Sequence, residues 1–333
     1  MWQTLNGLGS GLRRSPDRVQ HVSELHKFLF DKIRVRGAIV RLDDAWVEIL
    51  RRRASNTGTG AYPAPVQRLL GEMIAAGVLM QSGIKFDGAL ILQIQGDGPV
   101  KLAVAEVQAD LSVRATAAVS QALPDVIKFS EMVNVNNLGK CAITLDPKTR
   151  FPGQQAYQGI VALFGDKKEK LEKVSDVLSH YMLQSEQLQT TLVLAANETV
   201  AAGLLIQSLP EAKDQADDYN RVAILASSLK RDELLQLDVE TLLRRLFWEE
   251  SLIRFAPDSK GSIPRFACSC SRERVGRMIF SLGASEVESI LAERGNVEVG
   301  CDFCGQQYQF DAVDAAQVFV LPAQVVAGSS SPQ

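Results

Sequence analysis

Alternation of apolar and polar positions predicts strands through the first two thirds of the chain. In residues 90–95, positions 90, 92 and 94 are apolar and positions 93 and 95 are glutamine. This period of two places the apolar side chains on one face of a strand. A second apolar run, 101–107, follows Gly96-Asp97-Gly98-Pro99, a composition typical of a hairpin turn. The same reasoning predicts strands at 38–42, 113–119, 141–146, 156–164, 190–196 and 201–208.

Two stretches of this region instead have the spacing of a helix. Pro65 suits the first position of a helix, and one apolar face follows, formed by Val66, Leu69, Leu70, Met73, Gly77 and Met80. A second helix is predicted over 170–186, with an apolar side formed by Leu171, Val174, Leu178, Tyr181 and Met182. Many strands interrupted by a few helices indicate an α+β core domain with a mostly antiparallel sheet. We assign residues 21–210 to this domain.

After Pro210 the pattern becomes helical and amphipathic. Helices are predicted over 216–230 and 239–250, with Asp238 as N-cap of the second. Leu234, Leu235 and Leu237 are assigned to the connection between them. The amphipathic segment, residues 211–262, is too short to form its own core, so we expect it to lie on the adjacent sheet. It is either a separate linker or a helical lobe of the core domain, and residues 257–262 are expected to form a flexible joint.

The C-terminal module, residues 263–322, has its own helix and hairpin signals. Ser271 is expected to cap a helix that carries Val275, Met278, Ile279 and Leu282 and ends at Gly283. Ser285 and Glu288 have the spacing of a capping box for a second helix, which ends at Gly295. Strands 297–299 and 307–310 are predicted to form a hairpin, and Asp311 to cap a last helix through Phe319. Residues 1–20 are expected to be a mobile extension and 323–333 a disordered tail.

Composition and charge narrow the class of protein. The chain has 333 residues, of which 46% are hydrophobic and 23% charged, and its formal net charge is −3. This charge provides no basic field to attract nucleic acid. No apolar run approaches the roughly 18–20 residues that span a bilayer, and no apolar signal core follows Arg13-Arg14. We therefore expect a soluble, cytoplasmic protein whose thiols are reduced by default.

Four of the five cysteines form two close pairs. Cys268 and Cys270 are separated by one residue, and 30 residues later Cys301 and Cys304 are separated by two. Two such pairs indicate a Zn²⁺ site with four thiolate ligands, because each pair supplies two sulfurs from one short piece of backbone. With four thiolates and the metal, the net charge would become −5. The alternatives are two local disulfides or unpaired core cysteines.

These four thiols also form an oxidisable cluster. Four cysteine ligands leave no open coordination position, so hydrolysis at the metal is not expected. If an oxidant converts one sulfur to a sulfenic acid, its close partner can condense with it to a disulfide. Structural Zn²⁺ contributes apparent energies of about 10–16 kcal/mol in small domains, so loss of the metal should unfold the module. If the amphipathic segment packs against the module, it would then lose its support.

The remaining candidates for chemistry are weak. None of the three histidines, His21, His26 and His180, has an evident nucleophile or carboxylate partner in sequence. Cys141 opens a predicted strand and is expected to be buried in the core. The glycines of residues 7–11 follow no strand, so they do not form a phosphate loop. We expect no enzyme activity.

Specific motifs resemble the heat shock protein 33 family of redox-regulated chaperones. They are residues 266–274 around the first cysteine pair, the helix at 289–293 and Cys301-Asp302-Phe303-Cys304-Gly305. In the core the resemblance includes Arg36-Gly37, Leu69-Leu70-Gly71-Glu72, Lys85-Phe86-Asp87-Gly88, Gln95-Gly96-Asp97-Gly98-Pro99, Tyr157-Gln158-Gly159 and Ser185-Glu186-Gln187-Leu188. It extends over about residues 22–320.

This resemblance implies an ATP-independent cytoplasmic holdase that acts in the stress response. The reduced, zinc-bound form would be inactive. Peroxide with heat, or hypochlorous acid, would form Cys268–Cys270 and Cys301–Cys304 disulfides, release zinc and unfold the linker. Oxidised homodimers would then bind unfolding client proteins. The charge and the lack of a long apolar run predict neither a nucleic-acid nor a membrane partner.

Two other classes of function stay open at this point. In a zinc-ribbon nucleic-acid binder, Arg272, Arg274 and Arg277 would contact phosphates, whereas in a chaperone they would form a solvated helix face. A thiol–disulfide oxidoreductase would turn over a disulfide substrate catalytically, whereas a holdase acts stoichiometrically.

Overall fold

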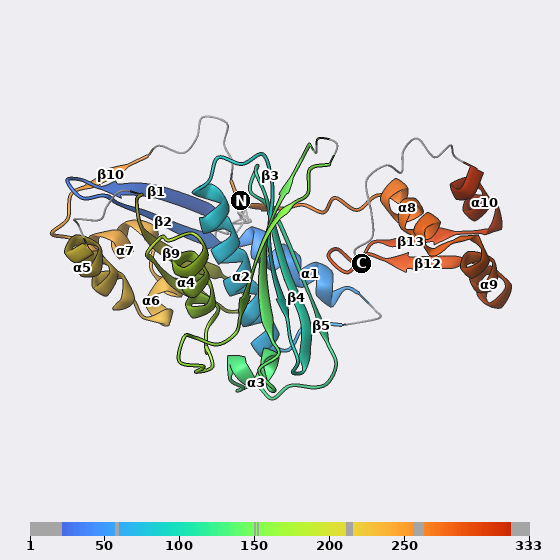
Figure 1. The fold of residues 1–333 in the computed structure, drawn as a ribbon, viewed down its shortest axis with the longest axis horizontal. Helices are drawn as coiled ribbons and strands as arrows, with labels where there is room; N and C mark the ends of the chain where they lie inside the picture. The colour runs from blue at the N-terminus through green and yellow to red at the C-terminus, as the bar shows by residue number, and fades with distance from the viewer. Residues whose placement is uncertain are drawn as a thin grey trace, which may run out of the picture.

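The computed structural model describes residues 22–56, 60–149, 151, 153–210, 216–255 and 263–320. The predicted mobile extension at 1–20, the joint at 257–262 and the tail at 323–333 lie outside these residues. The fold is α+β, as expected, and two sheets form its centre (Figure 1). No helix within the described ranges is long and apolar enough to cross a membrane.

The first sheet has five strands and the second has six. In spatial order, the first consists of β10 (Leu252–Arg254), β1 (Glu24–Phe30), β2 (Val35–Leu42), β9 (Ala201–Ser208) and β8 (Thr190–Ala196). The second consists of β11 (Arg265–Phe266), β5 (Ser112–Val119), β4 (Val100–Gln108), β3 (Gly88–Gln95), β6 (Lys140–Pro147) and β7 (Tyr157–Ala162). Pairing is antiparallel throughout both sheets except between β11 and β5, which are parallel.

The strands predicted from alternation are all present, and β3 and β4 form the predicted hairpin. Leu90, Leu92 and Ile94 are buried, while Gln95 on the other face of β3 is exposed. The helices α1 (Asp44–Ala54), α3 (Phe129–Val133) and α4 (Val174–Ser185) complete this region. The predicted start of α4 at residue 170 is wrong, because Lys170 forms a β-bridge with Phe164 and the helix begins four residues later.

The helix α2 (Ala64–Ser82) lies between the two sheets (Figure 1). The prediction of a single apolar face is wrong, since Ile74, Ala75 and Val78 are buried as well. Two glycines allow this helix to approach both sheets closely. A Cβ at Gly71 would lie 2.4 Å from Ala196 of β8, and one at Gly77 would lie 2.8 Å from Val107 of β4. Substitution at either position would therefore force a sheet and the helix apart.

The amphipathic segment packs on the face of the first sheet that points away from α2. Its helices are α5 (Ala216–Ser227), α6 (Arg231–Gln236) and α7 (Val239–Leu246), and Asp238 caps α7 as predicted, accepting from the Thr241 N–H. The assignment of Leu234 and Leu235 to a connection is wrong, because both lie on α6. The buried apolar residues of this layer include Tyr219, Val222, Leu234, Leu242 and Phe247, against Phe28, Phe30, Ile39, Leu204 and Ile206 of the sheet.

The C-terminal module contains α8 (Arg272–Leu282), α9 (Ala284–Arg294), β12 (Val297–Gly300), β13 (Gln307–Phe310) and α10 (Ala312–Val320). Ser271, Gly295 and Asp311 form the predicted caps, Asp311 by accepting from the Asp314 N–H. The predicted capping box at Ser285 is wrong: Gly283, at φ 92°, turns the chain directly into α9.

The core of this module is small. Its buried members are Val275, Ile279, Val287, Val297, Phe310 and Ala315. Met278 and Leu282, which we expected on the apolar face of α8, are about half exposed.

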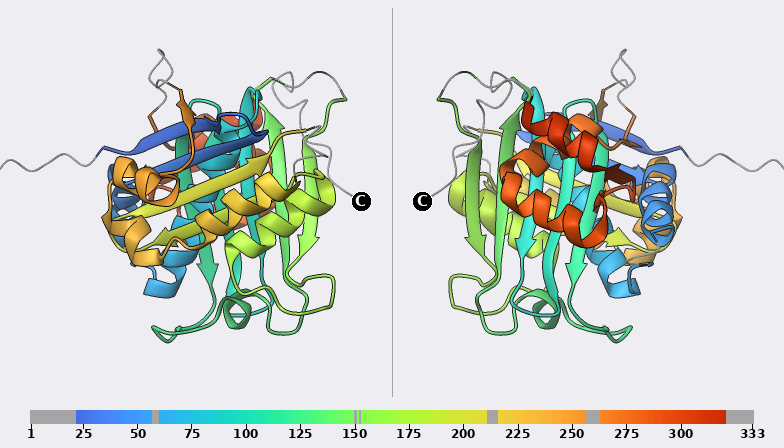
Figure 2. Two further views of the ribbon diagram at one scale, coloured as in Figure 1. Left: turned by 90° about the vertical axis from the view of Figure 1, so that its left-hand side faces the viewer. Right: turned by 90° about the vertical axis from the view of Figure 1, so that its right-hand side faces the viewer.

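The amphipathic segment and the C-terminal module lie at opposite ends of the molecule. In Figure 2 the helices α5–α7 face the viewer in the left view, and α8–α10 face the viewer in the right view. Their buried apolar residues form separate clusters. Support of the segment by direct packing on the module, which the sequence analysis considered, is therefore not observed among the described residues. The segment is supported by the first sheet.

Candidate metal centre

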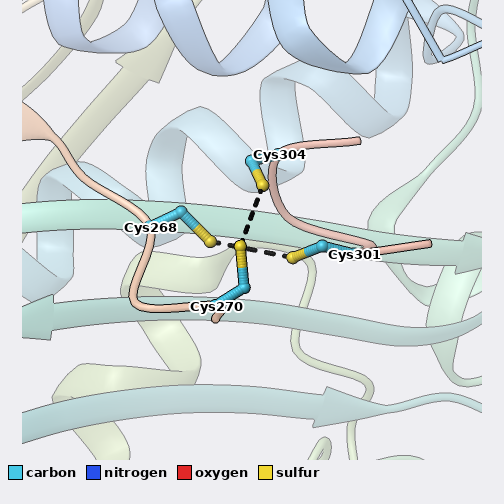
Figure 3. Close-up of side chains that lie close together, drawn as sticks. All are labelled: Cys268, Cys270, Cys301 and Cys304. Atoms are coloured by element: carbon cyan, nitrogen blue, oxygen red, sulfur yellow. Dashed lines mark hydrogen bonds between the residues drawn. The ribbon is translucent and has the colours of Figure 1, made fainter. Parts of the chain in front are cut away.

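The four paired cysteines converge on one point (Figure 3). Their sulfur atoms all lie within 4.8 Å of one another. Cys268 Sγ is 3.7 Å from Cys301 Sγ, and Cys270 Sγ is 3.3 Å from Cys304 Sγ. Four sulfurs at about 2.3 Å from a tetrahedral Zn²⁺ would be about 3.8 Å apart. The cluster therefore fits a metal ion with four thiolate ligands.

Two short pieces of backbone supply the ligands. Cys268 and Cys270 directly follow β11, which pairs with β5 of the core. Cys301 and Cys304 lie in the turn between β12 and β13, as predicted. The Gly305 N–H donates to the Cys301 carbonyl at 2.8 Å, and Gly305 takes a φ of 73°, which favours glycine. The turn thus places the two sulfurs of the second pair on one short piece of backbone.

The sulfurs hydrogen-bond to one another and to backbone N–H groups. The pKa of Cys268 is lowered to about 4, first by the hydrogen bond from the Cys301 thiol and then by the Cys270 N–H. The pKa of Cys301 is raised because that thiol donates to Cys268. Burial raises the pKa of Cys304 to about 11. Cys268 therefore has thiolate character, and the thiolate is the form that reacts with oxidants and metals.

Two residues that the sequence analysis did not identify contact the cluster. Arg114 of β5 donates to Cys268 Sγ at 3.8 Å and forms an ion pair with Glu106 at 2.6 Å. Its guanidinium also lies 4.2 Å from the ring centroid of Phe303, inside the second cysteine pair. Tyr308 donates its hydroxyl to Cys270 Sγ at 3.2 Å. A signal for Arg114 does exist in the sequence, since it is the one charged residue in an otherwise apolar and small β5.

The other candidates stay apart from the cluster. Cys141 is buried in β6, and burial raises the pKa of its thiol to about 12, as suits a core residue. His21 lies outside the described residues. The fold brings carboxylates to the other two histidines: His26 Nε2 lies 2.8 Å from Glu24 Oε2, and His180 Nε2 lies 3.9 Å from Asp166 Oδ1.

The arginines of α8 are largely engaged within the module. Arg272 pairs with Asp314 at 2.7 Å and lies over the ring of Phe310. Arg274 donates to the Ser269 carbonyl and hydroxyl, which fixes the loop between the first two cysteines. These contacts favour a structural role for both side chains over phosphate binding.

Comparison with known proteins identifies one family and several relatives that agree with it. A family model described as Hsp33 protein matches residues 23–311. The chain is 46% identical over 301 residues to the 33 kDa chaperonin of Chromobacterium violaceum, covering 90% of this chain and 95% of that protein. It is 41% identical over 304 residues to the 33 kDa chaperonin of Methylobacillus flagellatus, covering 90% and 96%.

A solved structure supports the same fold. The 33 kDa chaperonin (heat shock protein 33 homolog) of Thermotoga maritima superimposes with a TM-score of 0.69 and covers 89% of this chain and 97% of that one. At 19% identity, this likeness concerns the fold alone.

Proposed function

The chain belongs to the Hsp33 family, and on that premise we propose that it is a redox-regulated, ATP-independent holdase chaperone of the cytoplasm and not an enzyme. The observation that carries the proposal is the convergence of four thiols on one point at the boundary between the core and a module with few buried residues. A bound Zn²⁺, when present, would supply the cross-link that this small core lacks. Cys268, Cys270, Cys301 and Cys304 would hold it.

Oxidation would remove these ligands in pairs. Formation of each disulfide withdraws two electrons from two cysteines, and one molecule of hydrogen peroxide accepts them and is reduced to two molecules of water. We propose Cys268–Cys270 and Cys301–Cys304 as the bonds formed. The sulfur contacts of 3.7 and 3.3 Å join a cysteine of one pair to a cysteine of the other, so the proposed pairing requires the two sulfurs of each pair to move toward one another.

The consequence would be loss of the C-terminal module and then of the amphipathic segment from the first sheet. We propose the boundaries 21–210 for the core, 211–262 for the linker and 263–322 for the switch. The separate apolar cluster of the C-terminal module supports the last boundary, whereas the linker shares its cluster with the first sheet of the core. Apolar surface exposed in this way would bind unfolding client proteins, and the oxidised form would be a homodimer.

The proposal is tested by oxidising the zinc-loaded protein with peroxide at raised temperature. We expect zinc release, measured with a chromophoric chelator, to accompany suppression of client aggregation, measured by light scattering. Peptide mapping should find the two proposed disulfides. Release of zinc with no suppression of aggregation would contradict the holdase function while leaving the metal site intact.

Two cysteine variants sharpen this test. Cys301→Ser should weaken zinc binding and uncouple client binding from the oxidant. Cys141→Ala is the matched control, because it removes a buried thiol of β6 that is distant in sequence from the four paired cysteines. It should retain both zinc binding and the response to peroxide.

A further inference from the structure

Both core sheets have one edge covered by a very short strand. The three residues of β10 cover β1, and the two residues of β11 cover β5. These covering strands flank residues 256–262 and so belong to the part of the chain that joins the amphipathic segment to the C-terminal module. An uncovered edge strand presents unpaired N–H and C=O groups that accept another strand. The edge of β1 is therefore closed by a small element of the proposed linker.

The pairing of β10 shows what the β1 edge accepts. The register is antiparallel and joins Phe28 to Arg254, Leu29 to Ile253 and Phe30 to Leu252. Beyond the register, the Asp31 N–H donates to the Ser251 carbonyl at 2.8 Å, and the Phe255 N–H donates to the Lys27 carbonyl at 3.0 Å. The main chain of the covering strand thus provides bonds that do not depend on its side chains.

The side chains of β10 alternate between two environments. Leu252 packs with the apolar layer under α5–α7, and Arg254 pairs with Glu240 of α7. Ile253 and Phe255 point to the opposite face and are about half exposed. A groove of about 1000 Å³ lies on that face. It is lined by Leu25 and Leu29 of β1, Leu79 of α2, Leu111 and Phe255 itself.

We propose that the β1 edge and this groove form a strand-acceptor site for an extended apolar segment of an unfolded polypeptide. In the reduced protein β10 occupies the site, and the client takes its place when β10 leaves. Strand addition suits clients of unrelated sequence, because main-chain hydrogen bonds give affinity and apolar side chains at alternate positions fill the groove. This inference rests on the proposed chaperone function and assigns its client-binding surface.

The other sheet edges give weaker evidence for a strand-acceptor site. At the opposite edge of the first sheet, β8 is contacted by α4, α5 and α6. No strand of the described chain lies on the far edge of β7, so nothing indicates an occupant there. The part of β1 beyond β10 carries the hydrogen-bonded Glu24 and His26 together with Lys27. Charged side chains on an edge discourage pairing between identical copies, which favours a client segment over a second copy.

Hydrogen exchange of individual β1 amides tests the proposal. The N–H groups of Leu29 and Asp31 face β10, whereas those of Phe28 and Phe30 face β2 and serve as internal controls. We expect Leu29 and Asp31 to exchange slowly in the reduced protein and at least about 10-fold faster after oxidation. They should become slow again once a heat-unfolded client is bound. Phe28 and Phe30 should stay protected in all three states.

The outcomes separate this inference from the proposed function. If aggregation is suppressed but Leu29 and Asp31 still exchange rapidly with client bound, the edge proposal is wrong and the holdase function stands. If aggregation is not suppressed at all, the proposed function itself fails. Renewed protection without client that grows with protein concentration would assign the edge to a second copy and overturn the client assignment.

A peptide competition supplies a second, independent measurement. The hexapeptide Glu-Ser-Leu-Ile-Arg-Phe, which reproduces residues 250–255, should compete with client for the oxidised protein. N-methylation at its Phe255 position removes the N–H that bonds to Lys27 and should abolish competition. N-methylation at its Arg254 position removes an N–H that points away from β1 and should leave competition unchanged. Equal behaviour of the two methylated peptides would overturn the strand-addition geometry.

Discussion

Arg114 is the residue through which the core contacts both cysteine pairs. Its guanidinium lies against Cys268 Sγ from the first pair and against the ring of Phe303 within the second. Four thiolates around a divalent metal carry a net charge of −2, and a fixed cation beside them offsets part of it. Glu106 holds the guanidinium in place, so the two residues act as one positioning unit.

Replacing this unit should weaken metal binding without removing a ligand. We expect Arg114→Met combined with Glu106→Gln to lower metal affinity about 10- to 100-fold, the usual effect of losing a group that orients metal ligands. The double variant avoids leaving the buried Glu106 carboxylate without its cation. Affinity is measured by competition with a chromophoric chelator.

Arg272→Met is the matched control for this prediction. Arg272 also contacts an aromatic ring and a carboxylate, those of Phe310 and Asp314, but it hydrogen-bonds to the Gln309 carbonyl where Arg114 bonds to a sulfur. The Arg272→Met variant should bind metal nearly as tightly as the unaltered protein. An equal loss of affinity in both variants would mean that Arg114 acts only through the stability of the fold.

For individual residues, the sequence predicts the four cysteines better than it predicts the side chains that contact them. The cysteines of each pair are two and three residues apart, so their spacing alone indicates a shared site. Arg114 and Tyr308 are 154 and 38 residues from the sulfurs that they contact. Their roles depend on the pairing of β11 with β5 and of β12 with β13, and local spacing carries no information about either contact.

Among the elements, α7 shows how the amphipathic segment is held. Leu242 is only 1% exposed and packs in the layer between the segment and the first sheet. Ile224, on α5 of the same segment, is 70% exposed. The two side chains have similar size and polarity but differ in burial. The same substitution at each position therefore distinguishes the effect of lost packing from the effect of changing the residue type.

Shortening the buried side chain should loosen the segment. Leu242→Ala is expected to destabilise it by about 2–5 kcal/mol, and Ile224→Ala by no more than about 0.5 kcal/mol. Under the proposed function, Leu242→Ala should suppress client aggregation at a lower temperature or oxidant concentration, measured by light scattering against temperature. If both variants respond to peroxide as the unaltered protein does, release of the segment does not limit activation.

The elements that were not predicted from the sequence are β1, α1, α3, α6, β10 and β11, and the form of two of them, α6 and β10, depends on distant partners. The helix α6 has only six residues, too few to display a helical period, and its buried side chains are fixed by the sheet. The three residues of β10 become a strand only because β1 lies beside them. The all-round burial of α2 arises from having a sheet on each side, and the uninterrupted apolar run at 73–80 is its signal in the sequence.

Across the whole molecule, apolar burial is distributed very unevenly. The cluster around α2 and the cluster under α5–α7 are both large, whereas the apolar cluster in the described part of the C-terminal module has six buried members. A unit of that size has little stability of its own, and a structural metal adds an apparent 10–16 kcal/mol or so. The metal should therefore determine the folding of the C-terminal module, whereas the cluster around α2 should not depend on it.

Removal of the metal should accordingly have a local effect. Chelation of the reduced protein is expected to bring the amides of α8–α10 to nearly unfolded exchange rates, while those of α2 stay protected. Amide hydrogen exchange read by mass spectrometry measures both regions in one experiment, with α2 as the control. Persistent protection of α8–α10 without metal would show that the module folds on its own core, and the metal would then have no role in a folding switch.

The pairing of β1 with β10 also has a consequence for synthesis. The ribosome makes β1 near the start of the chain and β10 about 220 residues later. At roughly 5–20 residues per second, about 10–45 s pass before the covering strand exists. During that time the β1 edge of the nascent chain has no covering strand. The nascent protein and the proposed oxidised protein therefore expose the same strand, the first during synthesis and the second under stress.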